Sequence, residues 1–203
     1  MTSGCYRHAC SNSTSHVSRW LIRVTFLMPI LLGLSAYTHA GSIRTGETLP
    51  PIEITTGGKI VLEGSDYRTA PWAGPVSVPM VQVYQYVPGT RKGGSLYDPL
   101  TERMQRELDP TRFRITAIVN LDASSVFIKP FVRSEVVAKQ RVFQLATMVL
   151  DEDGVGVEVW QLDQESTFIV TDEQNTVIAA IFGPPSPEDL DHIFAVLADR
   201  LLP

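Results

Sequence analysis

The residues best placed to do chemistry form one short segment, GTRKGGSLYDP, which follows an apolar run. Two basic residues supply positive charge, and a glycine pair lets the backbone approach a ligand closely. A helix predicted to begin at Pro99 would point its free N–H groups and positive dipole end at the same place. The predicted binding site, for a small anion, a peptide or a protein partner, comprises Arg91, Lys92, Gly93, Gly94 and Ser95. The alternative is a flexible turn whose basic side chains are solvated.

Several chemistries are excluded at this segment. The spacing of Gly89 and Gly94 matches part of a Walker A loop, but Ser95 follows where that motif requires lysine. A serine hydroxyl needs a base to become a nucleophile, and the nearest histidine downstream is the distant His192. We therefore predict no catalytic residue here, no cofactor and no metal site.

The first forty residues have the order of a secretory signal peptide. Their only strong charges are Arg7, Arg19 and Arg23, and a mostly apolar stretch of thirteen residues, 24–36, follows. Small residues then surround a predicted cut after Ala40. About 20 apolar residues are needed to span a bilayer, so we expect cleavage and a periplasmic location. The alternative is an uncleaved N-terminal segment that anchors an envelope protein.

Cleavage would change both the charge and the thiol content. Residues 1–40 contain three of the 17 basic residues, none of the 22 acidic ones and both cysteines, Cys5 and Cys10. Residues 41–203 therefore carry a formal net charge of −8 and no thiol. They can form neither a disulfide nor a thiolate nucleophile. An acidic chain without a basic stripe also argues against nucleic acid as a partner.

The predicted elements alternate between strands and helices. Gly57-Gly58 predicts a turn between two short strands, and residues 65–74 are predicted to be a loop. Asp98 and Ser134 are the expected N-caps of two helices, and Ser186 is that of the last, which carries an S-x-x-D capping pattern. The remaining strands are expected at 76–87, 113–122, 146–151, 166–172 and 176–183, and residues 155–166 are ambiguous.

This order predicts an α/β fold. Strands that alternate with single helices indicate βαβ units, and a closing hairpin with a helix adds antiparallel strands. We expect a three-layer α/β/α sandwich with a mixed central sheet, formed by residues 41–203 as a single domain. An N-terminal β-hairpin would extend it.

The chain resembles the thioredoxin superfamily and, more narrowly, the YtfJ family of periplasmic bacterial proteins. The similar stretches are GETLPPIEITTGGKIVLEG, TAIVNLDAS, FVRS, DEDGVGVEVWQLDQES and the final helix. The resemblance implies a thioredoxin-like fold, a periplasmic location and no established activity. Redox members carry C-x-x-C or a peroxidatic cysteine at the strand-to-helix junction, and a cis-proline before the TFIVTD-like strand. This chain has GTRKGGSLYD and Gln164-Glu165-Ser166 instead.

The family-like stretches contribute a second candidate group. A thioredoxin-like layout would bring their polar residues to the edge that holds the redox site in other members. This predicted surface comprises Asn120, Asp122, Arg133, Trp160, Asp163 and Glu165. The alternative is that Trp160 belongs to the core and that the polar residues cap turns and helices.

The sequence thus predicts an exported thioredoxin-like protein without thiol redox activity. Its predicted role is to bind or regulate an envelope protein, a peptide or a small anion, and only the signal segment would contact the membrane. The alternative is a cysteine-free enzyme on the same scaffold that uses carboxylates. No matched acid and base is apparent for that chemistry.

Overall fold

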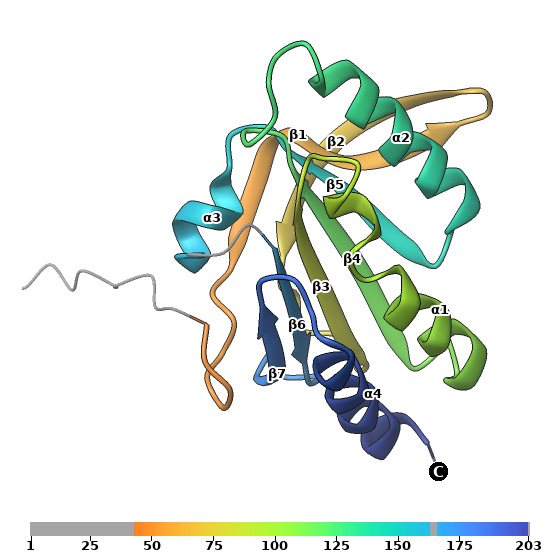
Figure 1. Cartoon of the computed structure of the whole chain (residues 1–203), viewed down its shortest axis with the longest axis vertical. Helices are drawn as coiled ribbons and strands as arrows, with labels where there is room; N and C mark the ends of the chain where they lie inside the picture. The colour runs from red at the N-terminus through yellow and green to blue at the C-terminus, as the bar shows by residue number, and fades with distance from the viewer. Residues whose placement is uncertain (1–42, 163–165, 203) are drawn as a thin grey trace, which may run out of the picture. The chain divides into compact units, whose positions relative to one another are not determined.

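The computed structural model describes residues 43–162 and 166–202, which build one seven-stranded mixed sheet (Figure 1). Its strand order is β2-β1-β5-β4-β3-β6-β7. The strands are β1 (Ile52–Glu63), β2 (Asp66–Gly74), β3 (Val81–Pro88), β4 (Phe113–Asn120), β5 (Ala146–Asp151), β6 (Thr167–Thr171) and β7 (Val177–Phe182). The helices are α1 (Asp98–Glu107), α2 (Lys129–Val142), α3 (Val155–Trp160) and α4 (Pro187–Leu201), with a 3₁₀ turn η1 at Gly93–Ser95. Within these residues, no helix has the length and apolar character needed to cross a membrane.

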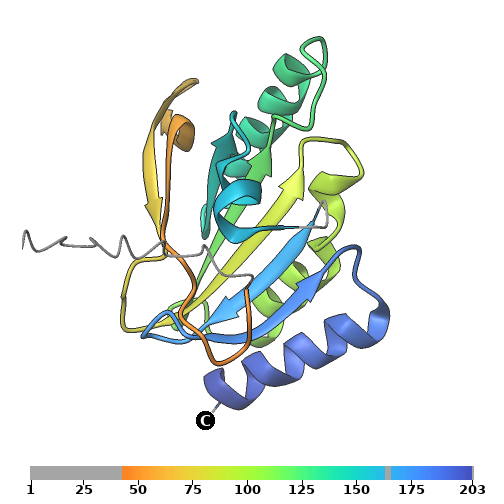
Figure 2. The same cartoon turned by 90° about the vertical axis from the view of Figure 1, so that its left-hand side faces the viewer.

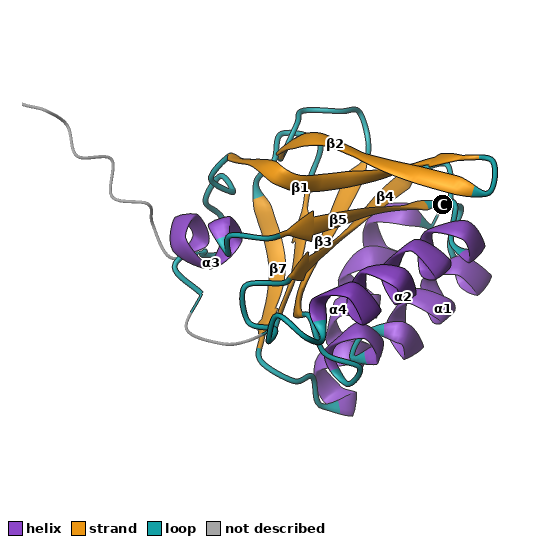
Figure 3. Ribbon diagram, turned by 90° about the horizontal axis from the view of Figure 1, so that it is seen from above, coloured by secondary structure: helices purple, strands orange, loops and turns teal. Residues whose placement is uncertain are grey.

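The predicted three layers are present. Strands β3, β4 and β5 are parallel, whereas β6 and β7 continue the sheet antiparallel on one side and β1 and β2 on the other. Helices α1, α2 and α4 lie on one face, and α3 lies on the opposite face (Figures 1 and 3). The expectation of a mixed α/β sandwich is confirmed.

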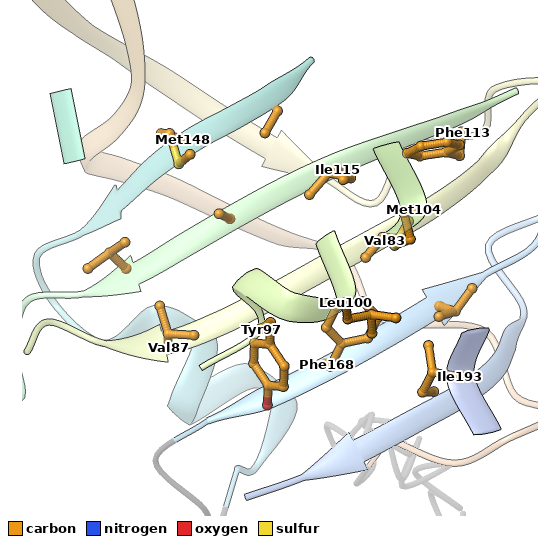
Figure 4. Close-up of a cluster of buried hydrophobic side chains, with 14 of the residues drawn as sticks. Val83, Val87, Tyr97, Leu100, Met104, Phe113, Ile115, Met148, Phe168 and Ile193 are labelled. Carbon is orange, nitrogen blue, oxygen red and sulfur yellow. The ribbon is translucent and has the colours of Figure 1, made fainter. Parts of the chain in front are cut away.

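Alternation along the strands divides the core in two. On β4, Ile115 and Val119 face α1, α2 and α4, whereas Ile118 belongs to the cluster on the α3 side. Figure 4 shows Val87, Ile115 and Met148 together on the helical face of the sheet. The central strands are buried on both faces, as is typical of parallel strands between helical layers.

The N-terminal hairpin differs from the prediction in its strand boundaries. Gly57 and Gly58 do not form its turn, because β1 runs through them as an irregularity, and the predicted loop 65–74 is mostly strand β2. A Cβ at Gly57 would lie 2.4 Å from the Leu150 carbonyl oxygen, and one at Gly58 2.2 Å from that of Ala70. The glycines therefore allow close approach to neighbouring strands, a requirement that local turn chemistry does not reveal.

The helix starts were predicted with mixed success. The N-cap of α1 is Tyr97, one residue earlier than expected, and Ser134 lies inside α2 with its hydroxyl donating to the Pro130 carbonyl. The capping box of α4 is confirmed, because Ser186 and Asp189 exchange side-chain and backbone hydrogen bonds. A serine can act as an N-cap only at the residue where a helix begins. Tertiary packing places the start of α2 before Ser134, so this serine lies within the helix.

Candidate functional site

The junction between β3 and α1 is an ordered turn. The Gly89 N–H donates to the Asn120 carbonyl at 2.8 Å, which ties the end of β3 to β4. The Thr90 hydroxyl accepts from the Gly93 N–H at 3.0 Å. A Cβ at Gly93 would lie 2.4 Å from the Pro88 carbonyl oxygen, so this glycine allows the chain to fold back on β3. Gly93 is buried, whereas the other four predicted site residues are exposed.

Most N–H groups of this loop already have acceptors inside it. Gly94 donates to the Thr90 carbonyl, Ser95 to the Lys92 carbonyl and Leu96 to the Gly93 carbonyl. An anion cradle needs these donors to be free, so the loop backbone is poorly suited to hold one.

The positive end of α1 is neutralised by the protein itself. Asp98 lies in the first turn of the helix, and its carboxylate forms an ion pair with Lys139 of α2 at 3.0 Å. Lys139 also donates to the Gly94 carbonyl, so one ammonium group joins α2, the loop and α1. Arg91 remains available: its guanidinium lies over the Phe131 ring, 5.8 Å from the centroid.

Beneath the loop, a cavity of about 500 Å³ lies between α1 and α2 on the helical face of the sheet. Val87, Ile115 and Met148 line its floor (Figure 4). Helix α1 packs on α4, and α2 packs on β5 and β1, so the two helices bordering the cavity are held by different neighbours. Its walls and rim include Thr90, Arg91, Gly93, Gly94, Ser95, Asp98, Val132, Glu135, Val136, Lys139 and Val142. The structure thus combines four of the five predicted loop residues with an apolar pocket that the sequence did not reveal.

The titratable side chains that line this cavity are Arg91, Tyr97, Asp98, Glu102, Glu135 and Lys139. The Tyr97 hydroxyl donates to the Gly183 carbonyl at 3.3 Å, and burial raises the pKa of this phenol above its ordinary value. The lining contains no histidine or cysteine, and His192 is exposed on α4. Across residues 43–162 and 166–202, no three His, Cys, Asp or Glu side chains cluster closely enough to hold a metal ion.

Of the second predicted group, Asn120 ends β4 and Asp122 follows two residues later, at the carboxyl end of a parallel strand. Asn120 is buried, and its side-chain oxygen accepts from the Asp122 N–H at 2.9 Å. Arg133 forms an ion pair with Glu152. Trp160 is fully buried and donates to the Pro50 carbonyl at 2.8 Å, so its indole is part of the core. Asp163 and Glu165 lie outside the described residues.

Asp151, predicted only as the last residue of the strand 146–151, is a buried carboxylate at the same edge. Asp151 is fully buried and accepts three hydrogen bonds: from the Tyr86 hydroxyl at 2.9 Å, the Val155 N–H at 3.0 Å and the Gly156 N–H at 2.9 Å. The available signal was an aspartate that ends a buried strand three residues before Gly154, the first glycine of GVG. The carboxylate fixes the start of α3 against β3 and β5.

Comparisons of fold place the protein among thioredoxin-like structures. The putative thiol:disulfide interchange protein DsbE from Chlorobium tepidum superposes with a TM-score of 0.54 at 16% identity, over 77% of this chain and 98% of that one. The thioredoxin domain of a thiol-disulfide oxidoreductase from Bacteroides vulgatus superposes with a TM-score of 0.53 at 13% identity, over 77% of this chain and 99% of that one. At these identities the likeness establishes the fold alone.

Comparisons of sequence identify a smaller group of relatives than comparisons of fold do. The "Uncharacterized protein YtfJ" of Escherichia coli (strain K12) is 29% identical over 183 residues, which cover 89% of this chain and 98% of that protein. An uncharacterized protein of Haemophilus influenzae is 22% identical over 165 residues, 80% of this chain and 90% of that one. The sequence model described as "Bacterial protein of unknown function (YtfJ_HI0045)" matches residues 43–198. The chain therefore belongs to the YtfJ family.

Proposed function

We propose that this protein is an exported, non-redox binding protein of the periplasm that holds a small, mainly apolar ligand between α1 and α2. The observation that carries this proposal is the cavity of about 500 Å³ beside the β3–α1 junction. Ligand pockets commonly measure 300–1,000 Å³ and combine apolar walls with a few polar groups. An apolar cavity of about 150 Å³ is already enough to bind benzene.

The polar groups at the rim would orient such a ligand. Arg91 offers a guanidinium that its contact with Phe131 leaves free to pair with an anionic end group. The Asp98–Lys139 ion pair spans the gap between the two helices. A ligand that inserts an apolar ring or chain would meet these groups at the rim. Gln85 and Thr101, which are hydrogen-bonded to each other at 2.8 Å, add polar atoms to the lining.

The absence of thiols supports a role outside disulfide exchange. Redox thioredoxins place cysteine at the strand-to-helix junction, and residues 89–98 of this chain contain none. Export would also remove Cys5 and Cys10 with the leader. We expect the exported protein to begin at Gly41 and to fail to reduce insulin. An intact mass that retains residues 1–40 would contradict the export part of the proposal.

The cavity is tested with the neutral dye N-phenyl-1-naphthylamine, whose fluorescence rises in apolar surroundings. We expect the dye to bind the wild-type protein one to one. The Ala117→Phe variant places a ring on the cavity floor and should bind at least tenfold more weakly. If that variant misfolds, Val136→Phe on α2 tests the same space.

The matched control is Ala123→Phe, which adds the same ring to an exposed loop position outside the cavity. Its affinity for the dye should equal that of wild type. Equal binding by wild type and by a folded Ala117→Phe protein would show that the cavity is not the site.

A further inference from the structure

A second hollow, of about 240 Å³, lies on the face of the sheet opposite α1 and α2. The β1–β2 hairpin forms one edge of the sheet, where β1 pairs with β5 through residues 57–59 (Figure 2). The residues Lys59, Trp72, Ala73, Gly74, Val76, Gln82, Tyr84, Arg114, Thr116 and Thr147 line this hollow, here called the polar trough.

Strand register explains why polar side chains meet in the polar trough. Tyr84 of β3 pairs with Thr116 of β4, which pairs with Thr147 of β5, so these three residues form one row across adjacent strands. Arg114 precedes Thr116 by two residues and therefore projects from the same face. Adjacent strands lie about 4.8 Å apart, so the two threonine hydroxyls and the guanidinium are within reach of one small ligand.

The polar trough contains two positive charges without acidic partners. Neither Lys59 nor Arg114 forms an ion pair with any carboxylate in the described part of the chain, where the ion pairs involve other cations. Burial raises the pKa of the Tyr84 hydroxyl above its ordinary value, and the nearby charge of Arg114 opposes that rise. Lys59 pairs with Val149 of β5, two residues beyond Thr147, whereas Arg114 lies two residues before Thr116 on β4. The two cations therefore flank the row of Tyr84, Thr116 and Thr147 from opposite ends, and an anion bound at this row would lie between them.

One wall of the polar trough is aromatic. The Trp72 ring meets the Tyr84 ring edge-on, with centroids 6.4 Å apart and planes at 61°. Gly74 makes room for the indole, because a Cβ there would lie 2.5 Å from the Trp72 Cζ2 atom. Trp72 is half-buried, so part of its ring remains available to a ligand.

We propose that the polar trough binds a small phosphate monoester whose phosphate lies between Lys59 and Arg114 and whose ring packs on Trp72. A phosphate monoester carries about −1.5 to −2 charges at pH 7, which matches the two cations. Its three terminal oxygens can accept from the guanidinium, the ammonium and the threonine hydroxyls, and arginine is well suited to pair with phosphate. This site is separate from the α1–α2 cavity, because the sheet lies between them.

The test is calorimetric titration of the purified protein with phenyl phosphate at low ionic strength. We expect one site per chain. The Arg114→Gln and Lys59→Gln variants should each bind at least tenfold more weakly. Both residues are exposed, so the fold should survive, as far-UV circular dichroism would verify. The control is Lys129→Gln, which removes one positive charge from the start of α2, outside both cavities, and should change the affinity less than twofold.

Two further probes address the chemistry of the ligand. Inorganic phosphate lacks the ring, and benzoate carries a single charge, so each should bind at least tenfold more weakly than phenyl phosphate. The proposal is overturned if phenyl phosphate does not bind, if Lys129→Gln weakens binding as much as Arg114→Gln, or if either probe matches phenyl phosphate. None of these outcomes bears on the dye experiment, which reports on the other face of the sheet.

Discussion

The buried carboxylate of Asp151 should be one of the most sensitive single positions for stability. Its two oxygens accept hydrogen bonds from one hydroxyl and two backbone N–H groups, at 2.9–3.0 Å. Replacement by asparagine keeps the shape of the side chain but turns one acceptor into a donor. The oxygen of the asparagine amide can accept from one of the two backbone N–H groups. The second backbone N–H then faces the NH₂ group of the amide at a fully buried side chain and has no acceptor there.

The expected cost follows from these contacts. A buried donor left without an acceptor costs about 1–3 kcal/mol, and a hydrogen bond to a charged group is worth roughly 1.5–3 kcal/mol against about 1 kcal/mol for a neutral one. The Tyr86 hydroxyl can rotate to accept from the new NH₂ group, so its contact is weakened but retained. We therefore expect Asp151→Asn to lower the free energy of unfolding by about 2–4 kcal/mol.

Urea unfolding followed by circular dichroism measures this loss. With a slope of about 2 kcal/mol/M, the midpoint should fall by about 1–2 M. The matched control is Asp153→Asn, two residues later and exposed, which should stay within about 0.5 kcal/mol of wild type. In a double-mutant cycle, Tyr86→Phe should cost less in the Asp151→Asn background than in wild type. A midpoint for Asp151→Asn equal to that of the control would refute the reasoning.

Three other predictions concern local features of the fold. Ser186→Ala removes the N-cap hydroxyl of α4 and should lower the free energy of unfolding by about 1 kcal/mol, measured as a shift of the urea midpoint. Gly156→Ala should destabilise by roughly 1–3 kcal/mol, because the new Cβ would lie 2.2 Å from the Tyr86 Cε2 atom. Gly94→Ala, which meets nothing within 4 Å, should be nearly silent by comparison. Hydrogen bonds from the Ser186 N–H and hydroxyl lower the pKa of the Asp189 carboxyl in the folded protein. The ionised carboxylate therefore stabilises the fold at a pH above the pKa of the unfolded state, about 3.9, and this stabilisation is lost as the pH falls through the lower pKa of the folded state. The acid limb of a stability-against-pH curve should therefore be shallower for Asp189→Asn than for wild type, and curves of identical slope would contradict this assignment.

The local signals that succeeded are those whose cause lies within a few residues. The capping pattern at Ser186 places its partner three residues away, so the sequence alone predicts the start of α4. Valine-rich runs such as VQVYQYV form strands buried on both faces, and the helix between β3 and β4 follows from the spacing of Leu100 and Met104. These facts, with the order of the elements, were enough to predict the mixed α/β sandwich.

The errors and the missed sites involve contacts between distant parts of the chain. Gly57-Gly58 looks like a turn locally, but packing against β5 and β2 made it part of a strand. The ion pair that spans the α1–α2 cavity joins residues 41 positions apart, Asp98 and Lys139. No local pattern reports such pairs.

The sequence by itself therefore determined the fold class, the lack of thiols in residues 41–203 and the position of the β3–α1 loop. Tertiary structure alone decided that this loop borders an apolar cavity and that Lys59, Arg114 and Thr147 line a second hollow. The physical reason is that periodicity sets which face of a strand is apolar. Strand register and helix packing then set which side chains of distant segments become neighbours.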